Sequence, residues 1–367
     1  MKVGMIVPGM QSMELNEGLL QLAEALGMDS IWLPDHLLGV THPALWSTFE
    51  ASVQLADPDA WLDPFCVAAV LGRKTRLAIG TCVTDTVRRR GPDLARTLMT
   101  LNASCGGGFI LGIGSGEAES LLPFGYDFTR PVGKLEEAAR TIRALLDTGR
   151  LPDAEKNDMQ NIGRSGLSPI GPNGRAQLWI AGGGERALEI VGRYADGWLP
   201  TGMTPEEFAR KRARVSEIAA AAGRPRPICG LFTLTLLGDS REQIAAAYER
   251  QPLAKLIALF APASLWRRYG LEHPSGPECR GHPDTIPHAV DPQKLRDLAQ
   301  KIPFAMMEDY LLIGNAEDIA ARLQPYAEAG AEHVILGDFT GLTFAPTEAG
   351  RLLTTQMGRL RQLLSAM

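Results

Sequence analysis

The chain has 367 residues, 45% of them hydrophobic and 22% charged, and a formal net charge of −5 at pH 7. This balance is typical of a soluble folded protein, and no apolar run approaches the ~18 residues of a membrane-spanning helix. The negative charge disfavours nucleic acid as a partner. The five cysteines form no C-x-x-C pair, which argues against a disulfide framework or a thiolate metal site. We therefore expect no bound metal. The N-terminus shows no signal-peptide pattern, so we expect a cytoplasmic protein.

Eight short apolar runs alternate along the chain with segments of helical periodicity. Each run is almost continuously apolar, as expected for a strand buried on both faces. This alternation predicts a parallel sheet built from βα units, and eight strands close a (β/α)8 TIM barrel. We therefore predict one α/β barrel domain over residues 1–367; two doubly wound domains fit less well. The predicted strands are 3–7, 30–33, 76–83, 109–113, 177–181, 197–200, 228–236 and 333–336.

Three segments interrupt this alternation. Residues 38–63 follow the second predicted strand and residues 251–303 follow the seventh, and both are rich in proline, histidine and aromatic residues. Loops after strands open onto the catalytic face of a barrel, so we expect these insertions to form the walls of a substrate pocket. The alternative is that they are ordered surface insertions. Residues 149–176 form a third irregular segment.

Candidate acid–base residues follow the second and fourth strands. Asp35 and His36 stand side by side where the chain leaves strand two, and Glu117 follows the glycine-rich turn Gly114, Ser115 and Gly116 after strand four. Histidine suits proton transfer because its ordinary pKa is near 6.5. The alternatives are that His36 only caps the strand or packs under a loop, and that the glycine-rich turn holds no ligand.

The ends of strands three and five favour a bound cofactor. Strand three ends in Thr81, Cys82, Val83 and Thr84, small residues that can contact a flat ring, and Gly80 allows a ligand or another backbone to approach closely. Strand five ends in Ala181, Gly182, Gly183 and Gly184, directly before a predicted helix. Successive glycine N–H groups at a helix N-terminus form a site for a phosphate. Four consecutive strand ends of this kind are hard to attribute to turn chemistry alone.

The motifs SIWLPDH, AIGTCVTD, LGIGSGE, LWIAGGG and GRYADGW together resemble the luciferase-like monooxygenase superfamily. The Asp-His pair and the glutamate are most similar to the branch that uses the deazaflavin coenzyme F420, which includes methylenetetrahydromethanopterin reductases and phthiodiolone ketoreductases. The resemblance implies that His36 and Glu117 lie beside the reactive ring carbon. It also implies a non-proline cis peptide at Cys82–Val83. Val40 replaces a tryptophan of the sugar-phosphate dehydrogenases, so glucose 6-phosphate is not the expected substrate.

We therefore expect hydride transfer between coenzyme F420 and a small-molecule ketone, alcohol or imine, in a protein that forms a homodimer. His36, backed by Asp35 or Glu117, would move the proton. One alternative is an FMN-dependent two-component monooxygenase, and a second is a non-catalytic flavin-binding or deazaflavin-binding barrel. The residues expected to bind the cofactor are Asp35, His36, Thr81, Cys82, Val83, Thr84, Gly114, Ser115, Gly116, Glu117, Ala181, Gly182, Gly183 and Gly184.

Overall fold

The computed structural model describes residues 1–152 and 159–367 of the chain. Residues 153–158, part of the third irregular segment, lie outside the described residues. None of the helices in the described part of the chain is both long enough and apolar enough to cross a membrane.

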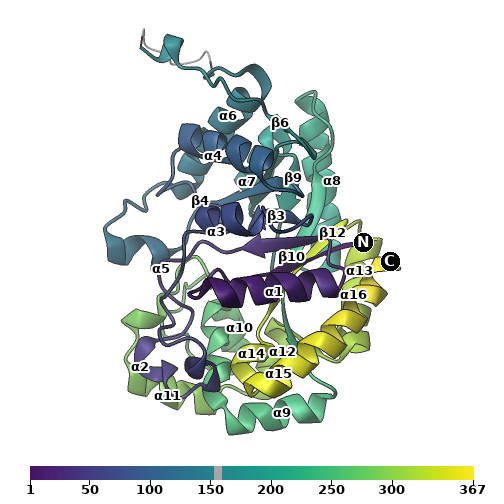
Figure 1. Cartoon of the computed structure of the whole chain (residues 1–367). Helices are drawn as coiled ribbons and strands as arrows, with labels where there is room; N and C mark the ends of the chain where they lie inside the picture. The colour runs from purple at the N-terminus through teal and green to yellow at the C-terminus, as the bar shows by residue number, and fades with distance from the viewer. Residues whose placement is uncertain (153–158) are drawn as a thin grey trace.

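The main sheet closes on itself as a (β/α)8 barrel of parallel strands (Figure 1). Its order around the barrel is β1, β2, β3, β5, β8, β9, β10 and β12, and β12 pairs with β1 to close the ring. All eight predicted strands are therefore confirmed. Their bounds are β1 Lys2–Ile6, β2 Ser30–Leu33, β3 Ala78–Thr81, β5 Phe109–Gly114, β8 Gln177–Ala181, β9 Gly197–Leu199, β10 Ile228–Leu237 and β12 His333–Asp338.

Two departures from the predicted strands occur. The third predicted strand, 76–83, is divided into β3 and β4 (Thr84–Asp85), and the Cys82–Val83 peptide bond between them is cis, as expected. A short strand that the apolar pattern did not predict, β11 (Leu312–Gly314), pairs with the outer end of β10. It was missed because three residues are too few to show a periodicity. A separate hairpin joins β6 (Ile170–Gly171) to β7 (Gly174–Arg175).

Helices cover the outside of the barrel. Their apolar faces pack against outward-facing strand residues such as Ile31, Leu33 and Leu111 in one continuous core. Asn315 caps α13 (Ala316–Glu328) in a capping box with Asp318. The larger helices around the barrel are α1 Met13–Ala25, α3 Pro64–Leu71, α4 Gly91–Ser104, α6 Pro131–Thr148, α7 Glu185–Tyr194, α8 Pro205–Ala221, α9 Arg241–Arg250, α13 Ala316–Glu328, α15 Pro346–Leu352 and α16 Gly358–Ser365.

Short helices make up most of the two insertions and the remaining connections. The first insertion contains α2 (Pro43–Trp46) and the 3-10 helix Glu50–Val53. The second contains the 3-10 helices Pro252–Phe260 and Pro287–Ala289 with α10 (Ala263–Arg268) and α11 (Pro292–Lys301), and α12 (Phe304–Tyr310) follows it. Apolar residues of both insertions share a second core with β10 and α9. The other short helices are α5 Ala118–Leu121, α14 Thr340–Thr343, the 3-10 helices Leu122–Phe124 and Gln160–Ile162, and a π-helix at Leu353–Met357.

Two tryptophans fill the inside of the barrel. The rings of Trp32 on β2 and Trp179 on β8 lie 5.3 Å apart, and both side chains are almost fully buried. A Cβ atom at Gly80 would lie under 3.0 Å from three atoms of the Trp32 indole. Gly80 therefore makes room for this side chain and not, as its position suggested, for a ligand or another backbone.

Candidate active site

The strand ends singled out in the sequence meet at one edge of the barrel. Because β2, β3, β5 and β8 are consecutive in the ring and parallel, their carboxyl ends face the same side. His36 follows β2, Cys82 and Val83 follow β3, and Glu117 follows β5. The structure thus brings these predicted residues to one end of the barrel.

His36 and two glutamates form the centre of this edge. Nδ1 of His36 lies 2.5 Å from Oε1 of Glu119 and 3.9 Å from Oε2 of Glu117. Glu119 is fully buried, whereas 34% of the Glu117 side chain is exposed. Gly116, with a φ of 91°, supplies the left-handed turn that precedes Glu117. Glu119 was not predicted as a site residue, although the Glu-x-Glu spacing that places it near Glu117 is visible in the sequence.

The ionisation of these groups is shifted towards protonation. Burial alone would lower the pKa of His36, but the charges of Glu119, Glu117 and Asp35 and the hydrogen bond to Glu119 raise it to about 9. Burial raises the pKa of Glu117 to about 7, and His36 opposes that rise. His36 is therefore charged near neutral pH, while Glu117 exchanges its proton in that range. A pair of this kind can give and accept protons.

Asp35 takes a different position from its neighbour. Its carboxylate accepts a hydrogen bond of 2.6 Å from the Thr84 hydroxyl and one of 3.1 Å from Nε of Arg89, and it forms an ion pair of 3.2 Å with Arg88. Successive side chains of an extended segment point in opposite directions. The His36 ring points towards the site, so the Asp35 side chain points away from it. The carboxylate that holds His36 is that of Glu119. Asp35 and Thr84 instead join the β2 and β4 loops.

The residues after β3 divide into two groups. Thr81 is fully buried, and its hydroxyl donates to the carbonyl oxygen of Gly112 and accepts from the Gly112 N–H, both at 2.9 Å. It therefore contributes to the pairing of β3 with β5. Cys82 and Val83 are partly exposed, and a Cβ at Gly114 would lie 2.9 Å from the Val83 side chain. Burial raises the pKa of the Cys82 thiol, so this cysteine stays protonated.

The glycine turn after β8 has the form of an anion site. Ala181 ends β8, Gly182 has a φ of 135°, and Gly184 is the N-cap of α7. A Cβ at Gly184 would meet nothing within 4 Å, and one at Gly183 would lie 3.6 Å from Nζ of Lys211. Open space, the first N–H groups of α7, which have no side-chain cap among the described residues, and a nearby ammonium group together suit a phosphate. Lys211 was not predicted because it lies on α8, distant in the sequence.

Polar groups from the second half of the chain also reach the site. Nδ1 of His282 lies 4.0 Å from Oε1 of Glu117, and the His282 ring stacks on Phe260. Neither nitrogen of His282 nor the buried Tyr310 hydroxyl has a hydrogen-bond partner among the described residues. Burial lowers the pKa of His282 to about 3, and raises the pKa of Tyr310. Sequence reasoning missed both residues because they lie within or just after a long irregular insertion.

The two insertions are joined to each other above His36. The Trp61 ring of the first insertion lies 4.8 Å from the ring of His36. Asp59, in the same insertion, accepts a hydrogen bond of 2.6 Å from the Gly39 N–H and is bonded at 3.0 Å to Nε2 of His288 in the second insertion. The sequence predicted that both insertions form the walls of a substrate pocket but indicated no contact between them, and this hydrogen bond links them.

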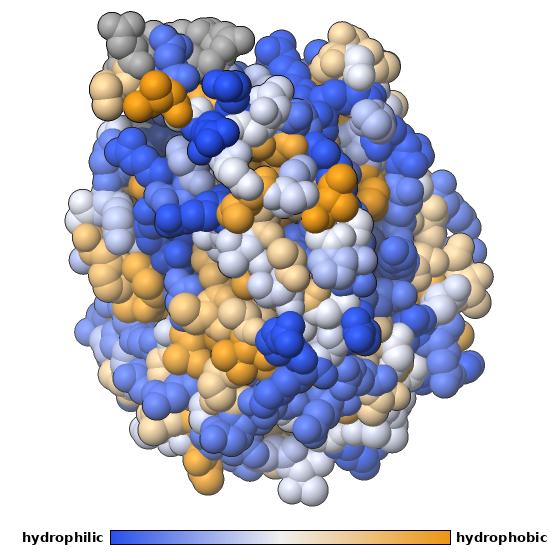
Figure 2. Space-filling view, turned by 45° about the horizontal axis from the view of Figure 1, so that its top comes forward, coloured by the Kyte–Doolittle hydropathy of each residue, from blue (hydrophilic) through white to orange (hydrophobic). Residues whose placement is uncertain are grey.

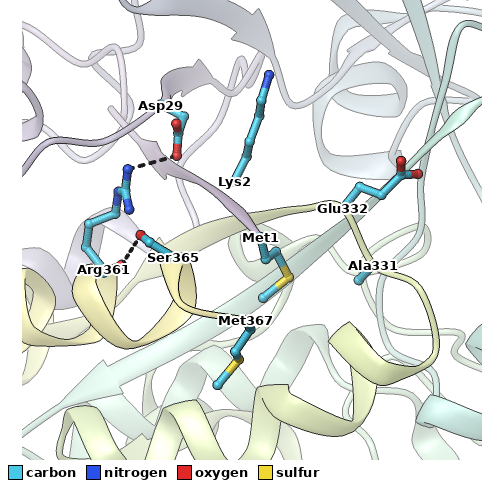
Figure 3. Close-up of a pocket in the computed structure, with 8 residues that line it drawn as sticks. All are labelled: Met1, Lys2, Asp29, Ala331, Glu332, Arg361, Ser365 and Met367. Carbon is cyan, nitrogen blue, oxygen red and sulfur yellow. Dashed lines mark hydrogen bonds and ion pairs between the residues drawn. The ribbon is translucent and has the colours of Figure 1, made fainter.

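A pocket of about 530 Å³ lies at the opposite end of the barrel (Figure 3). It is lined by residues that precede or begin strands, such as Lys2 and Glu332, and by an ion pair of 3.2 Å between Arg361 and Asp29. Both termini lie beside it. Barrel enzymes place their chemistry at the carboxyl ends of the strands, so this pocket is not the candidate site.

The cluster at the carboxyl ends has one property that the sequence did not indicate. His36, Glu117 and Glu119 each offer a ligand atom, and these atoms all lie within 4.8 Å of one another. Such a spacing could also hold a metal ion, but the His36–Glu119 hydrogen bond engages two of these groups. Acid–base chemistry uses the same atoms without further rearrangement.

The chain is similar in sequence to known reductases and in fold to an F420-dependent enzyme of known structure. The chain is 34% identical over 331 residues to a phthiodiolone/phenolphthiodiolone dimycocerosates ketoreductase of Mycobacterium kansasii, which covers 86% of this chain and 88% of the relative. It is 22% identical to a 5,10-methylenetetrahydromethanopterin reductase of Archaeoglobus fulgidus, over 93% of this chain and 94% of that one. An F420-dependent secondary alcohol dehydrogenase, solved with an F420-acetone adduct, has the same fold, with a TM-score of 0.68, 17% identity and 98% of both chains covered. The sequence profile of the luciferase-like monooxygenase family matches residues 1–333, and the chain belongs to this family.

Proposed function

We propose that this protein is an oxidoreductase that uses coenzyme F420 and transfers a hydride between the deazaflavin and a ketone, alcohol or imine. The observation that carries the proposal is the pairing of a charged His36 with a Glu117 whose pKa is raised to about 7, at the carboxyl ends of the barrel strands. Reduction of a carbonyl group needs one proton for each hydride, and this pair can supply it. The names of the relatives support the same class of reaction.

The described residues fit such a cofactor. The glycine turn at 182–184, the N-terminus of α7 and Lys211 would hold its phosphate. Cys82 and Val83, both partly exposed, would lie against the ring system, and Val83 lies beside Gly114. When bound, a deazaflavin supplies a hydride and does not form the oxygen adducts of flavin monooxygenases.

The chain's own residues would bind, orient and protonate the substrate. His36 keeps Nδ1 on Glu119, so its Nε2–H remains to donate to a substrate oxygen. Glu117 would return the proton to His36 or donate directly, because its pKa lies near neutrality. The unpartnered His282 and Tyr310 groups would hold a polar part of the substrate, since a buried polar group without a partner costs about 1–3 kcal/mol.

We also propose that the two insertions form the walls of the substrate pocket on a single barrel domain of residues 1–367. Trp61 against His36 supports this role for the first insertion, and His282 beside Glu117 supports it for the second. A homodimer and a cytoplasmic location stay predictions.

Binding and turnover test the choice of cofactor. Fluorescence quenching titrations are expected to show tighter binding of F420 than of FMN. Anaerobic turnover with reduced F420 and a panel of ketones is expected to consume the cofactor. The FMN monooxygenase alternative instead requires oxygen and NADPH consumption through a flavin reductase. If FMN binds tightly and F420 does not saturate the protein, the proposal of an oxidoreductase stands but the assignment of F420 as its cofactor is wrong.

Alanine variants test the proposed proton carriers. We expect His36→Ala and Glu117→Ala to reduce turnover by about 10²–10⁴-fold, with cofactor affinity changed far less, because both residues are assigned to proton movement. If the cofactor binds to saturation but neither the parent protein nor any variant shows turnover, the result would instead support the non-catalytic cofactor-binding barrel.

A further inference from the structure

Glu119 is the most deeply buried carboxylate of the site. It lies on the four-residue helix α5 and has no exposed surface. Its Oε1 atom forms a hydrogen bond of 2.5 Å with Nδ1 of His36. Its other oxygen, Oε2, has no hydrogen-bond partner in the described part of the chain. A buried carboxylate that is ionised is costly unless a nearby positive charge compensates it. The group in that position is the imidazole of His36.

The segment that carries Glu119 is fixed at both ends. The Ala118 N–H donates to the carbonyl oxygen of Pro283 in the second insertion at 3.0 Å. The Ser120 hydroxyl accepts a hydrogen bond of 3.1 Å from the N–H of Leu37, next to His36. The backbone on both sides of Glu119 is therefore held in place, next to the residue that follows His36.

We infer that Glu119 is a positioning residue, which holds His36 through Nδ1–H and directs Nε2–H at the reacting substrate oxygen. A carboxylate bound to one ring nitrogen sets both the orientation of the imidazole and the nitrogen left free for chemistry. The contact to substrate rests on the proposed function, whereas the Glu119–His36 bond does not. Glu117, two residues earlier and at 3.9 Å, is too far from Nδ1 to replace it.

The charged groups around His36 lead to a specific expectation. Glu119 and Glu117 face the ring from one side, Asp35 precedes it, and His282 approaches from the second insertion. Arg88 compensates Asp35, so Asp35 contributes less than its proximity suggests. Burial lowers the pKa of His36, and the nearest carboxylate is the main group that reverses this effect. Without Glu119, the proton on His36 should be lost at a lower pH.

The test is the titration of His36 in the cofactor-free protein, followed by NMR of its ring and assigned with His36→Gln. We expect Glu119→Gln to lower the pKa of His36 by at least ~1 unit. Glu117→Gln is the matched control, because it removes the same charge from 3.9 Å instead of 2.5 Å and should have the smaller effect. Glu119→Asp keeps the charge and should restore part of the shift. If Glu119→Gln does not fold, Glu119→Asp and a downfield Nδ1–H signal in the parent protein carry the same test.

Turnover gives a second, independent reading. In Glu119→Gln, kcat should fall at neutral and alkaline pH and its alkaline limb should move to lower pH with the pKa of His36, while KM changes little. An unchanged pKa of His36, or a fall no larger than in Glu117→Gln, would overturn the inference. If Glu119→Gln lowers the pKa of His36 as expected but neither the parent protein nor any variant turns over reduced F420, the positioning role stands and the proposed function fails.

Discussion

Replacing Gly80 with alanine is expected to lower the free energy of unfolding by about 1–3 kcal/mol, the usual cost of overpacking a dense core. The added Cβ would lie under 3.0 Å from three atoms of the Trp32 indole. That ring cannot move away easily, because it is fully buried, stands 5.3 Å from the ring of Trp179 and donates from Nε1 to Ser30 at 2.8 Å. The backbone of β3 would have to shift instead.

Urea unfolding followed by tryptophan fluorescence measures this change through the transition midpoint at constant slope. Gly18→Ala is the matched control: Gly18 lies inside α1, and a Cβ there would meet nothing within 4 Å. This control is expected to raise stability by about 0.5–1 kcal/mol, because alanine favours a helix over glycine. A Gly80→Ala protein as stable as its parent, with a stabilised Gly18→Ala, would refute the reasoning on Trp32.

Three further predictions concern the site. Burial lowers the pKa of His36 and the neighbouring carboxylates raise it, with a net rise to about 9. The charged form of His36 therefore stabilises the folded protein fully below about pH 6.5, and this stabilisation is lost as the pH rises to about 9. Urea midpoints across this range should fall, and a flat profile would contradict the shift. Lys211→Ala should weaken F420 binding in a quenching titration and leave the pKa of His36 unchanged; equal affinity would exclude Lys211 from the phosphate site. Brief alkylation and mass spectrometry should find the exposed Cys66 modified well before Cys82, whose thiol has a pKa raised by burial. Equal labelling of the two would speak against that burial.

The barrel could be predicted from the sequence because its strands are continuous apolar runs separated by helical periodicity. Burial on both faces leaves this pattern directly in the residue types, as in Ile31, Trp32 and Leu33 of β2. The role of Gly80 could not be predicted in the same way. Whether a glycine makes room for a ligand or for a side chain depends on what lies on the next strand, and the neighbouring residue here is a tryptophan 48 positions earlier.

The candidate site was predictable only where its residues follow strands. His36 and Glu117 were found because strand ends of a parallel barrel meet at one edge. Glu119 was missed because its burial and its contact with His36 depend on the turn into α5. Asp35 was expected to support His36, and its charge does raise the pKa of that histidine. Its hydrogen bond to Arg89 could not be predicted, because the two residues are 54 positions apart in the sequence. His282 and Tyr310 come from segments without a regular pattern.

The face of the protein shown in Figure 2 is mixed, with apolar residues in patches among hydrophilic ones. The loops on a barrel of this kind are often treated as exchangeable parts. Here the bond from His288 to Asp59, which also accepts from Gly39, makes the two insertions a single unit. A graft that imports one loop from a relative would leave the partly buried Asp59 carboxylate or the partly buried His288 imidazole without its hydrogen-bond partner. If the insertions form the proposed pocket walls, an exchange designed to change substrate preference should therefore replace both insertions together, as a matched pair.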